Sequence, residues 1–309
     1  MPRTGYLTEG DWRDEFHKYG CVVIKNVISP ERAEYYREKQ IQWLKNFDLG
    51  FDERDESTWK EAHLPVSFKG GMYFAYGSPH EKMAWEARSE PAVIKIFETL
   101  WETKELISSF DGMNISMPRR KDLRWSPWPH CDQNQRRKVM QAVQGLLNYA
   151  PNGPKDGGLM LMKGSAKLFD EFFAQKRESY NHEDALPPEM EYMDLFLFSD
   201  KDVNMDPGDF VLWDSRTMHY ACLPEGDQIR HVQYICMIPK RFASPEALEL
   251  KKQCFENYIG TIHWPHCNIR PAKEKPMRGD VVWPKDRSVP FEKPELTDTV
   301  LKLAGVKAY

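Results

Sequence analysis

A short polar cluster in the middle of the chain has the residue types that bind metals. His130 and Asp132 are separated by one residue in the run Trp128-Pro129-His130-Cys131-Asp132. Side chains alternate faces along an extended strand, so this imidazole and this carboxylate point to the same side. One metal ion can bind both without a bend in the backbone. The pair supplies two of the three protein ligands of a 2-His-1-carboxylate facial triad.

A second histidine, His219, can complete this triad. It lies just beyond the end of an apolar strand-like run, 209–213, which opens with the turn signal Pro207-Gly208. Strands remote in sequence face each other in a jelly roll, so we expect His219 to meet His130 and Asp132. Three ligands on one face of an octahedral ion leave the opposite face open, which suits iron(II) that binds a cosubstrate and dioxygen together.

Arg230, on the next predicted strand, is the candidate anchor for that cosubstrate. A guanidinium is always charged and grips a carboxylate with two parallel hydrogen bonds. This geometry suits the far carboxylate of 2-oxoglutarate, whose other end would chelate the iron. A lysine would supply the charge but not the two parallel hydrogen bonds.

Length and composition narrow the class of protein. The chain has 309 residues, 41% of them hydrophobic, enough for one large domain or two small ones. A net charge of −4 and a pI near 6.2 argue against nucleic acid as the main partner. Six scattered cysteines without a Cys-x-x-Cys pair indicate free thiols in a reducing compartment. We find no signal-peptide or membrane-spanning run, so we expect a cytoplasmic protein without a membrane partner.

The elements that must position these residues follow from periodicity and turn signals. Helices are expected over 30–47, with Ser29 as N-cap, and over 91–102. The predicted strands are 21–24, 106–110, 113–117, 139–149, 158–162, 209–213 and 231–238. Helices followed by short strands predict an α+β, mainly β fold: a double-stranded β-helix (jelly roll, cupin-like) with flanking N-terminal helices. We expect one domain over 1–309, with N-terminal helices and substrate-side loops (1–104), a jelly-roll core (105–240) and a C-terminal helix with a wrapping tail (241–309).

At these residues the chain resembles the phytanoyl-CoA dioxygenase-like family of iron(II)/2-oxoglutarate oxygenases. The resemblance lies in His130-x-Asp132, Val143–Asn148, Asp156-Gly157-Gly158-Leu159 leading to Lys163-Gly164-Ser165, Gly208-Asp209 leading to His219, and Arg230. It implies a double-stranded β-helix with His130, Asp132 and His219 on Fe(II) and Arg230 on 2-oxoglutarate. It also implies dioxygen as a substrate, with succinate and CO2 released.

The chain departs from the family pattern at two places. Many members read Pro-Gly-Ser-His where this chain has Lys163-Gly164-Ser165-Ala166. Several members also place a serine two residues after the second iron histidine, and here that position is Ala221. We expect Asn148, Ser215 or Thr217 to compensate as further contacts to 2-oxoglutarate.

The substrate wall is predicted from segments outside the iron motif. Residues 48–82 form a long irregular stretch around Gly70-Gly71, and such stretches in compact domains are often binding loops. Pockets for small organic molecules combine apolar walls with a few polar groups. The residues expected to contact substrate are Met72, Tyr73, Phe74, Asn114 and Trp264.

The expected reaction is oxidation of a small organic molecule from secondary or lipid-like metabolism. Hydroxylation is the default, and desaturation, epoxidation or rearrangement would use the same site. Two alternatives stay open: a cupin-like metalloenzyme that does not use 2-oxoglutarate, which would have no need of Arg230, and a non-catalytic binding protein with the same barrel. An acyl-CoA or a protein side chain is an alternative substrate. The oligomeric state is open, and a homodimer is compatible with the sequence.

Overall fold

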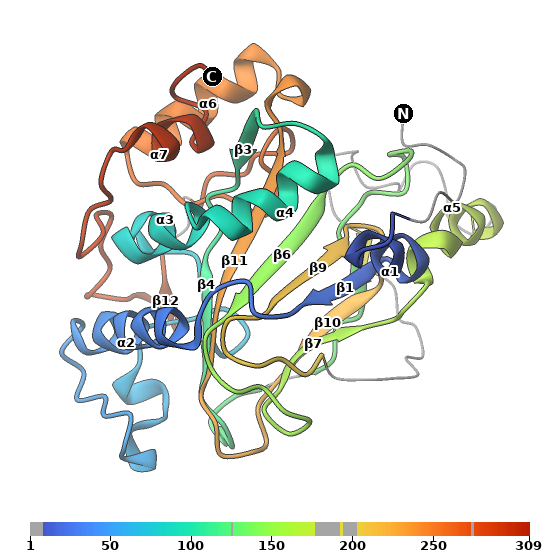
Figure 1. The fold of residues 1–309 in the computed structure, drawn as a ribbon. Helices are drawn as coiled ribbons and strands as arrows, with labels where there is room; N and C mark the ends of the chain where they lie inside the picture. Colours follow the sequence, from blue (N-terminus) through green and yellow to red (C-terminus); the bar gives the residue numbers. More distant parts are fainter. Residues whose placement is uncertain (1–8, 125, 177–191, 194–202, 273–274) are drawn as a thin grey trace.

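The computed structural model describes residues 9–309 except 125, 177–191, 194–202 and 273–274. Within these residues the strands form a seven-stranded sheet, a four-stranded sheet and a small hairpin (Figure 1). All the strand pairs are antiparallel. The predicted α+β class, with antiparallel β-structure at its centre, is confirmed.

The larger sheet has the strand order β1-β9-β6-β11-β4-β2, and β3 also pairs with β11. Its strands are β1 (Cys21–Ile24), β2 (Met72–Tyr73), β3 (Leu106–Ser108), β4 (Met113–Ser116), β6 (Val143–Asn148), β9 (Phe210–Asp214) and β11 (Arg230–Pro239). The N-terminal strand β1 therefore extends the sheet beyond the predicted jelly-roll region by pairing with β9.

The smaller sheet has the order β7-β10-β5-β8. Its strands are β5 (His130–Cys131), β7 (Gly158–Leu161), β8 (Tyr192–Met193) and β10 (His219–Cys222). From β4 to β7, and again from β9 to β11, successive strands alternate between the larger and the smaller sheet. This alternation is the winding of a double-stranded β-helix, and it brings strands that are distant in sequence together.

The helices pack mainly against the larger sheet (Figure 1), where α3 and α4 contact β11. The helices are α1 (Trp12–Tyr19), α2 (Pro30–Lys45), α3 (Lys82–Arg88), α4 (Pro91–Trp101), α5 (Ser165–Lys176), α6 (Pro245–Glu256) and α7 (Asp298–Leu303), and the 3-10 turns are η1 (Glu56–Thr58), η2 (Glu61–His63), η3 (Ser78–His80) and η4 (Lys240–Phe242). As predicted, Ser29 caps α2, accepting a hydrogen bond from the Arg32 backbone N–H at 3.2 Å.

Strand alternation divides the larger sheet into two faces. Ile235 and Met237 of β11 belong to the core shared with the helices. Val232 of the same strand belongs to a second core, which contains residues of both sheets and against which Tyr234 packs. Both faces are therefore buried, which explains why these strands are so apolar.

The C-terminal residues return to the body of the protein. The carboxylate of Glu81 accepts hydrogen bonds from the backbone N–H groups of Phe291, at 2.6 Å, and Glu292, at 2.9 Å. The hairpin of β12 (Met277–Arg278) and β13 (Val281–Val282) precedes this contact. In the part of the chain that is described, we find no helix with the length and apolar character needed to cross a membrane.

Candidate metal centre

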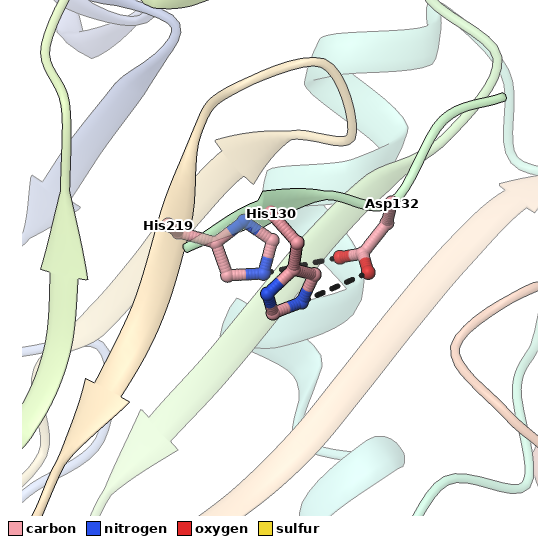
Figure 2. Close-up of side chains that lie close together, drawn as sticks. All are labelled: His130, Asp132 and His219. Carbon is pink, nitrogen blue, oxygen red and sulfur yellow. Dashed lines mark ion pairs between the residues drawn. The ribbon is translucent and has the colours of Figure 1, made fainter. Parts of the chain in front are cut away.

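Three side chains from the smaller sheet converge on one point (Figure 2). His130 opens β5, Asp132 follows directly after this strand, and His219 opens β10. His130 and His219 are paired across the two strands, so their side chains share a face. Asp132 oxygens lie 3.4 Å from His130 Nε2 and 3.1 Å from His219 Nε2. His219 lies just beyond the apolar strand β9, as predicted, and begins a separate strand because the turn after Asp214 carries the chain into the other sheet.

The two imidazoles are oriented by matching backbone contacts. His130 Nδ1 lies 2.7 Å from the carbonyl oxygen of Trp128, and His219 Nδ1 lies 2.9 Å from that of Thr217. A carbonyl oxygen only accepts, so each Nδ1 must carry the hydrogen. Each Nε2 then lies on the ring edge nearest Asp132, and in the neutral imidazole it carries the lone pair that a metal ion would accept. Such contacts fix the tautomer and ring orientation of metal-binding histidines.

The carboxylate of Asp132 is held ionised inside the protein. Burial opposes its charge, but the imidazoles of His263, His219 and His130 outweigh burial and hold the pKa of Asp132 well below its usual value. Gln144, on β6 of the facing sheet, donates a side-chain hydrogen bond to Asp132 Oδ2. A deprotonated carboxylate with one oxygen fixed by an amide is suited to bind a cation.

The donor set fits a divalent transition metal. Within the described residues, the ligand atoms of His130, Asp132 and His219 lie within 4.8 Å of one another. Two imidazole nitrogens and one carboxylate oxygen are the ligands of the facial triad of non-heme iron(II) oxygenases. His130 is half-buried, whereas Asp132 and His219 are buried. His130 is therefore the most exposed of the three side chains.

Arg230 lies inside the barrel at the start of β11 and is buried. Its guanidinium lies beside Gly158, where an added Cβ would be 3.2 Å from Arg230 Nε. Gly158 has a φ of +118°, so glycine is favoured there on conformational grounds as well. Arg230 Nε has no hydrogen-bond partner among the described residues. A buried guanidinium with an unpartnered N–H donor is suited to bind an anionic ligand such as a carboxylate.

The other predicted cosubstrate contacts have different surroundings. Asn148 pairs with Val232 and therefore faces the space between the sheets. Its amide donates to the carbonyls of Ala150 and Asp206, and its Oδ1 has no partner among the described residues. Ser215 Oγ donates to the side chain of Gln133, and Thr217 Oγ1 donates to the carbonyl of Gly20. Asn148 thus lies opposite Val232, two residues from Arg230 on the same face of β11.

Adjacent residues of the predicted substrate loop face opposite sides of the larger sheet. Met72 pairs with Asn114, which in turn pairs with Val232 of the core between the sheets. Met72 and Asn114 therefore face the inside of the barrel. Tyr73 faces the opposite way, is 2% exposed and packs edge-on against Trp43 in the core shared with the helices. Because of this strand alternation, Tyr73 is a core residue and we withdraw it from the substrate wall.

The C-terminal residues near the site support the loop that follows Asp132. Trp264 is 1% exposed, and the guanidinium of Arg137 lies 5.1 Å from its ring centroid. Its neighbour His263 contributes to the low pKa of Asp132. His263 therefore belongs to the surroundings of the metal centre.

Sequence reasoning also missed Gln144 as the hydrogen-bond partner of Asp132. The signal was present, because Gln144 is a polar residue inside the apolar run Val143–Asn148. Its role depends on the contact between the two sheets, which the sequence does not specify.

We expect Gln144→Leu to weaken iron(II) binding by about 10- to 100-fold, the usual cost of losing a group that orients a metal ligand. Anaerobic calorimetric titration with iron(II) measures the affinity. Gln233→Leu is the matched control, since Gln233 is a buried glutamine whose amide donates to the carbonyl of Gly112. Equal affinities for the Gln144 variant and the wild type would remove Gln144 from the site.

A double-stranded β-helix with two histidines and one carboxylate defines the class of non-heme metal oxygenases. Comparisons with known proteins agree with this class. No family model matches the sequence. The "Ava biosynthesis cluster protein O" of Aspergillus versicolor is 57% identical over 270 residues, covering 83% of this chain and 86% of the relative. The "Putative phytanoyl-CoA dioxygenase" of Dictyostelium discoideum is 23% identical, covering 79% of each chain.

Among solved structures, the product of GlcNAc Inducible Gene 2 (DUF1479) from Candida albicans shares the fold with a TM-score of 0.57. The two are 16% identical, and the match covers 96% of this chain and 76% of that one. The chain belongs to the phytanoyl-CoA dioxygenase-like family of iron(II)- and 2-oxoglutarate-dependent oxygenases. The sequence motifs predicted this family.

Proposed function

We propose that this oxygenase binds iron(II) through His130, Asp132 and His219, anchors 2-oxoglutarate through Arg230, and oxidises a small organic molecule. The observation that carries the proposal is the convergence of two oriented imidazoles and one ionised carboxylate in the barrel. The buried Arg230, with an unpartnered Nε, supports the cosubstrate. We propose that the whole chain, 1–309, forms one oxygenase domain, with helices and tail around the barrel.

Bound iron(II) with 2-oxoglutarate and dioxygen supplies oxidation of a C–H bond, coupled to release of succinate and CO2. The protein orients the metal ligands and excludes water from the site. His130 and His219 present Nε2 because their Nδ1 hydrogens are engaged by backbone carbonyls. The apolar side chains between the sheets, including Val211, Trp213 and Val232, keep solvent from the reacting groups.

The substrate class follows from the family and the relatives. The Aspergillus versicolor relative takes its name from a biosynthesis cluster, which supports a role in secondary metabolism. We propose hydroxylation as the default outcome, with desaturation, epoxidation or rearrangement set by how the substrate is held. The test is incubation with candidate small molecules, iron(II), 2-oxoglutarate and air. One succinate per oxidised product supports the proposal, and product formation without 2-oxoglutarate would contradict it.

The inner side of the substrate loop is proposed to select the substrate. Phe74 is half-buried and close to Gly112, where an added Cβ would be 2.9 Å from the Phe74 ring. Phe74 follows β2 directly, two residues after Met72, whose side chain faces the barrel.

We expect Phe74→Ala to lower substrate affinity or change the product distribution, whereas the uncoupled conversion of 2-oxoglutarate to succinate persists. The uncoupled conversion should persist because it needs the metal centre and Arg230 but not the substrate wall. The measurement is succinate and product formation in the same reaction. Loss of both activities together, or a change in neither, would make the loop structural.

A further inference from the structure

Lys69 lies in a tight turn whose backbone conformation does not favour lysine. In this turn, residues 68–72, the backbone N–H groups of Phe68 and Met72 each donate to the carbonyl of the other residue at 2.9 Å. Lys69 has a φ of +48°, in the left-handed region that glycine and asparagine adopt most readily. Other residues in this region carry a backbone cost, and they cluster at active sites and ligand clamps. The side chain of Lys69 is therefore a candidate for a role in function.

The ammonium of Lys69 contacts aromatic rings but no anion. Its Nζ lies 4.5 Å from the ring centroid of Trp128 and 6.0 Å from that of Phe68. Among the described residues it has no hydrogen-bond acceptor and no carboxylate partner. Arg120, by contrast, is paired with Asp122 at 2.6 Å. A half-buried ammonium with three N–H donors and no anion beside it is suited to bind an anionic ligand.

Trp128 connects Lys69 to the metal centre. The Trp128 carbonyl accepts the hydrogen of His130 Nδ1, and the two rings are nearly parallel, at 14°, with centroids 6.4 Å apart. The Lys69 ammonium is therefore no more than about 11 Å from the His130 ring, since the separations of 4.5 Å and 6.4 Å set this upper limit. Met72, at the end of the same turn, faces the inside of the barrel. Lys69 is thus within the length of a small organic molecule from the most exposed metal ligand.

The surface beside Lys69 is apolar. Phe68 is exposed, although it is a large aromatic residue. Leu123 and Leu223, both half-buried, lie against Gly70, where an added Cβ would be 2.5 Å and 3.3 Å from their side chains. Apolar walls with a few placed polar groups are typical of sites for small organic ligands. A cation bordered by these side chains fits a ligand with an apolar body and one anionic group.

We propose that Lys69 determines substrate specificity: its ammonium binds a carboxylate of the substrate, and the apolar residues beside it contact the rest of the molecule. The substrate class is then small organic acids with an apolar body. This inference rests on the proposed function and adds an anion-binding position outside the iron and 2-oxoglutarate sites. Lys69 supplies one positive charge, which one carboxylate balances, whereas a phosphate carries nearly two negative charges.

The test is Lys69→Asn, which removes the charge and keeps a residue that adopts the left-handed conformation. The probes are phenylalkanoic acids of increasing chain length and the corresponding neutral amides. Each is titrated by calorimetry, without oxygen, into protein loaded with iron(II) and 2-oxoglutarate, so that Arg230 is already occupied. We expect the wild type to bind the best acid about 5- to 10-fold more tightly than its amide, as for a charge pair partly exposed to water. This preference should decrease with added salt and be lost in Lys69→Asn.

Lys69→Arg restores the charge and should keep the preference for acids. Lys95→Gln is the matched control, because it removes one positive charge from the surface of α4, where Lys95 Nζ lies 3.7 Å from Glu98. It should bind all probes as the wild type does. A wild type that binds acids no more tightly than amides would overturn the inference, as would an undiminished preference in Lys69→Asn. If the wild type binds neither iron(II) nor 2-oxoglutarate, the proposed function itself is overturned and this inference with it.

Discussion

His219→Ala is expected to abolish turnover and to weaken iron(II) binding by more than about 100-fold, since loss of a direct ligand should exceed the effect of losing a supporting residue. His219 is one of two imidazoles that present Nε2 to the shared site, and no other histidine is grouped with them among the described residues. We expect the fold to persist, because the backbone of β10 pairs with β5 and β7 whatever the side chain.

The measurements are bound iron per chain, product formation and the circular dichroism spectrum. The matched control is His231→Gln, since His231 is buried on the opposite side of β11 and contacts Gln40 at 3.0 Å. That variant should retain iron and activity. Conversion of substrate by His219→Ala at near the wild-type rate would show that the triad is misassigned.

Arg230→Ala is expected to raise the KM for 2-oxoglutarate by at least about 30-fold. Truncating one partner of a buried, hydrogen-bonded charge pair costs about 2–5 kcal/mol, and each 1.4 kcal/mol corresponds to about tenfold in affinity. The iron affinity should change little, because Arg230 contributes no ligand atom to the metal group. Steady-state kinetics with varied 2-oxoglutarate and a separate iron titration check both parts.

Arg230→Lys serves as the comparison within this experiment. Lysine keeps the positive charge but lacks the planar fork that holds both carboxylate oxygens. The KM of the lysine variant should therefore lie between those of the wild type and the alanine variant. An unchanged KM in Arg230→Ala would show that another cationic residue anchors 2-oxoglutarate.

The candidate ligands could be predicted because their signals are local. His130 and Asp132 are close in sequence, and His219 follows a strongly apolar strand. The family's strand order then implies that these segments meet, and the structure brings their side chains together. The helix over 30–47 was equally accessible, since its cap and its apolar spacing are both local features.

The remaining features depend on strand register and on contacts between the sheets. Whether Met72 or Tyr73 faces the barrel depends on the pairing of β2 with β4, and a shift of one residue would exchange them. Gln144 reaches Asp132 only because β6 lies opposite the smaller sheet. Helix α5 (Ser165–Lys176) was not predicted from the sequence.

The most direct test of the metal centre is an anaerobic titration of the metal-free protein with iron(II), followed by 2-oxoglutarate, in the wild type and in Asp132→Ala. We expect one iron per wild-type chain and a visible charge-transfer band when 2-oxoglutarate is added. We expect neither in Asp132→Ala, because the buried carboxylate between His130 and His219 is then missing. Equal iron binding and an equal band in both proteins would contradict the assignment of this metal centre.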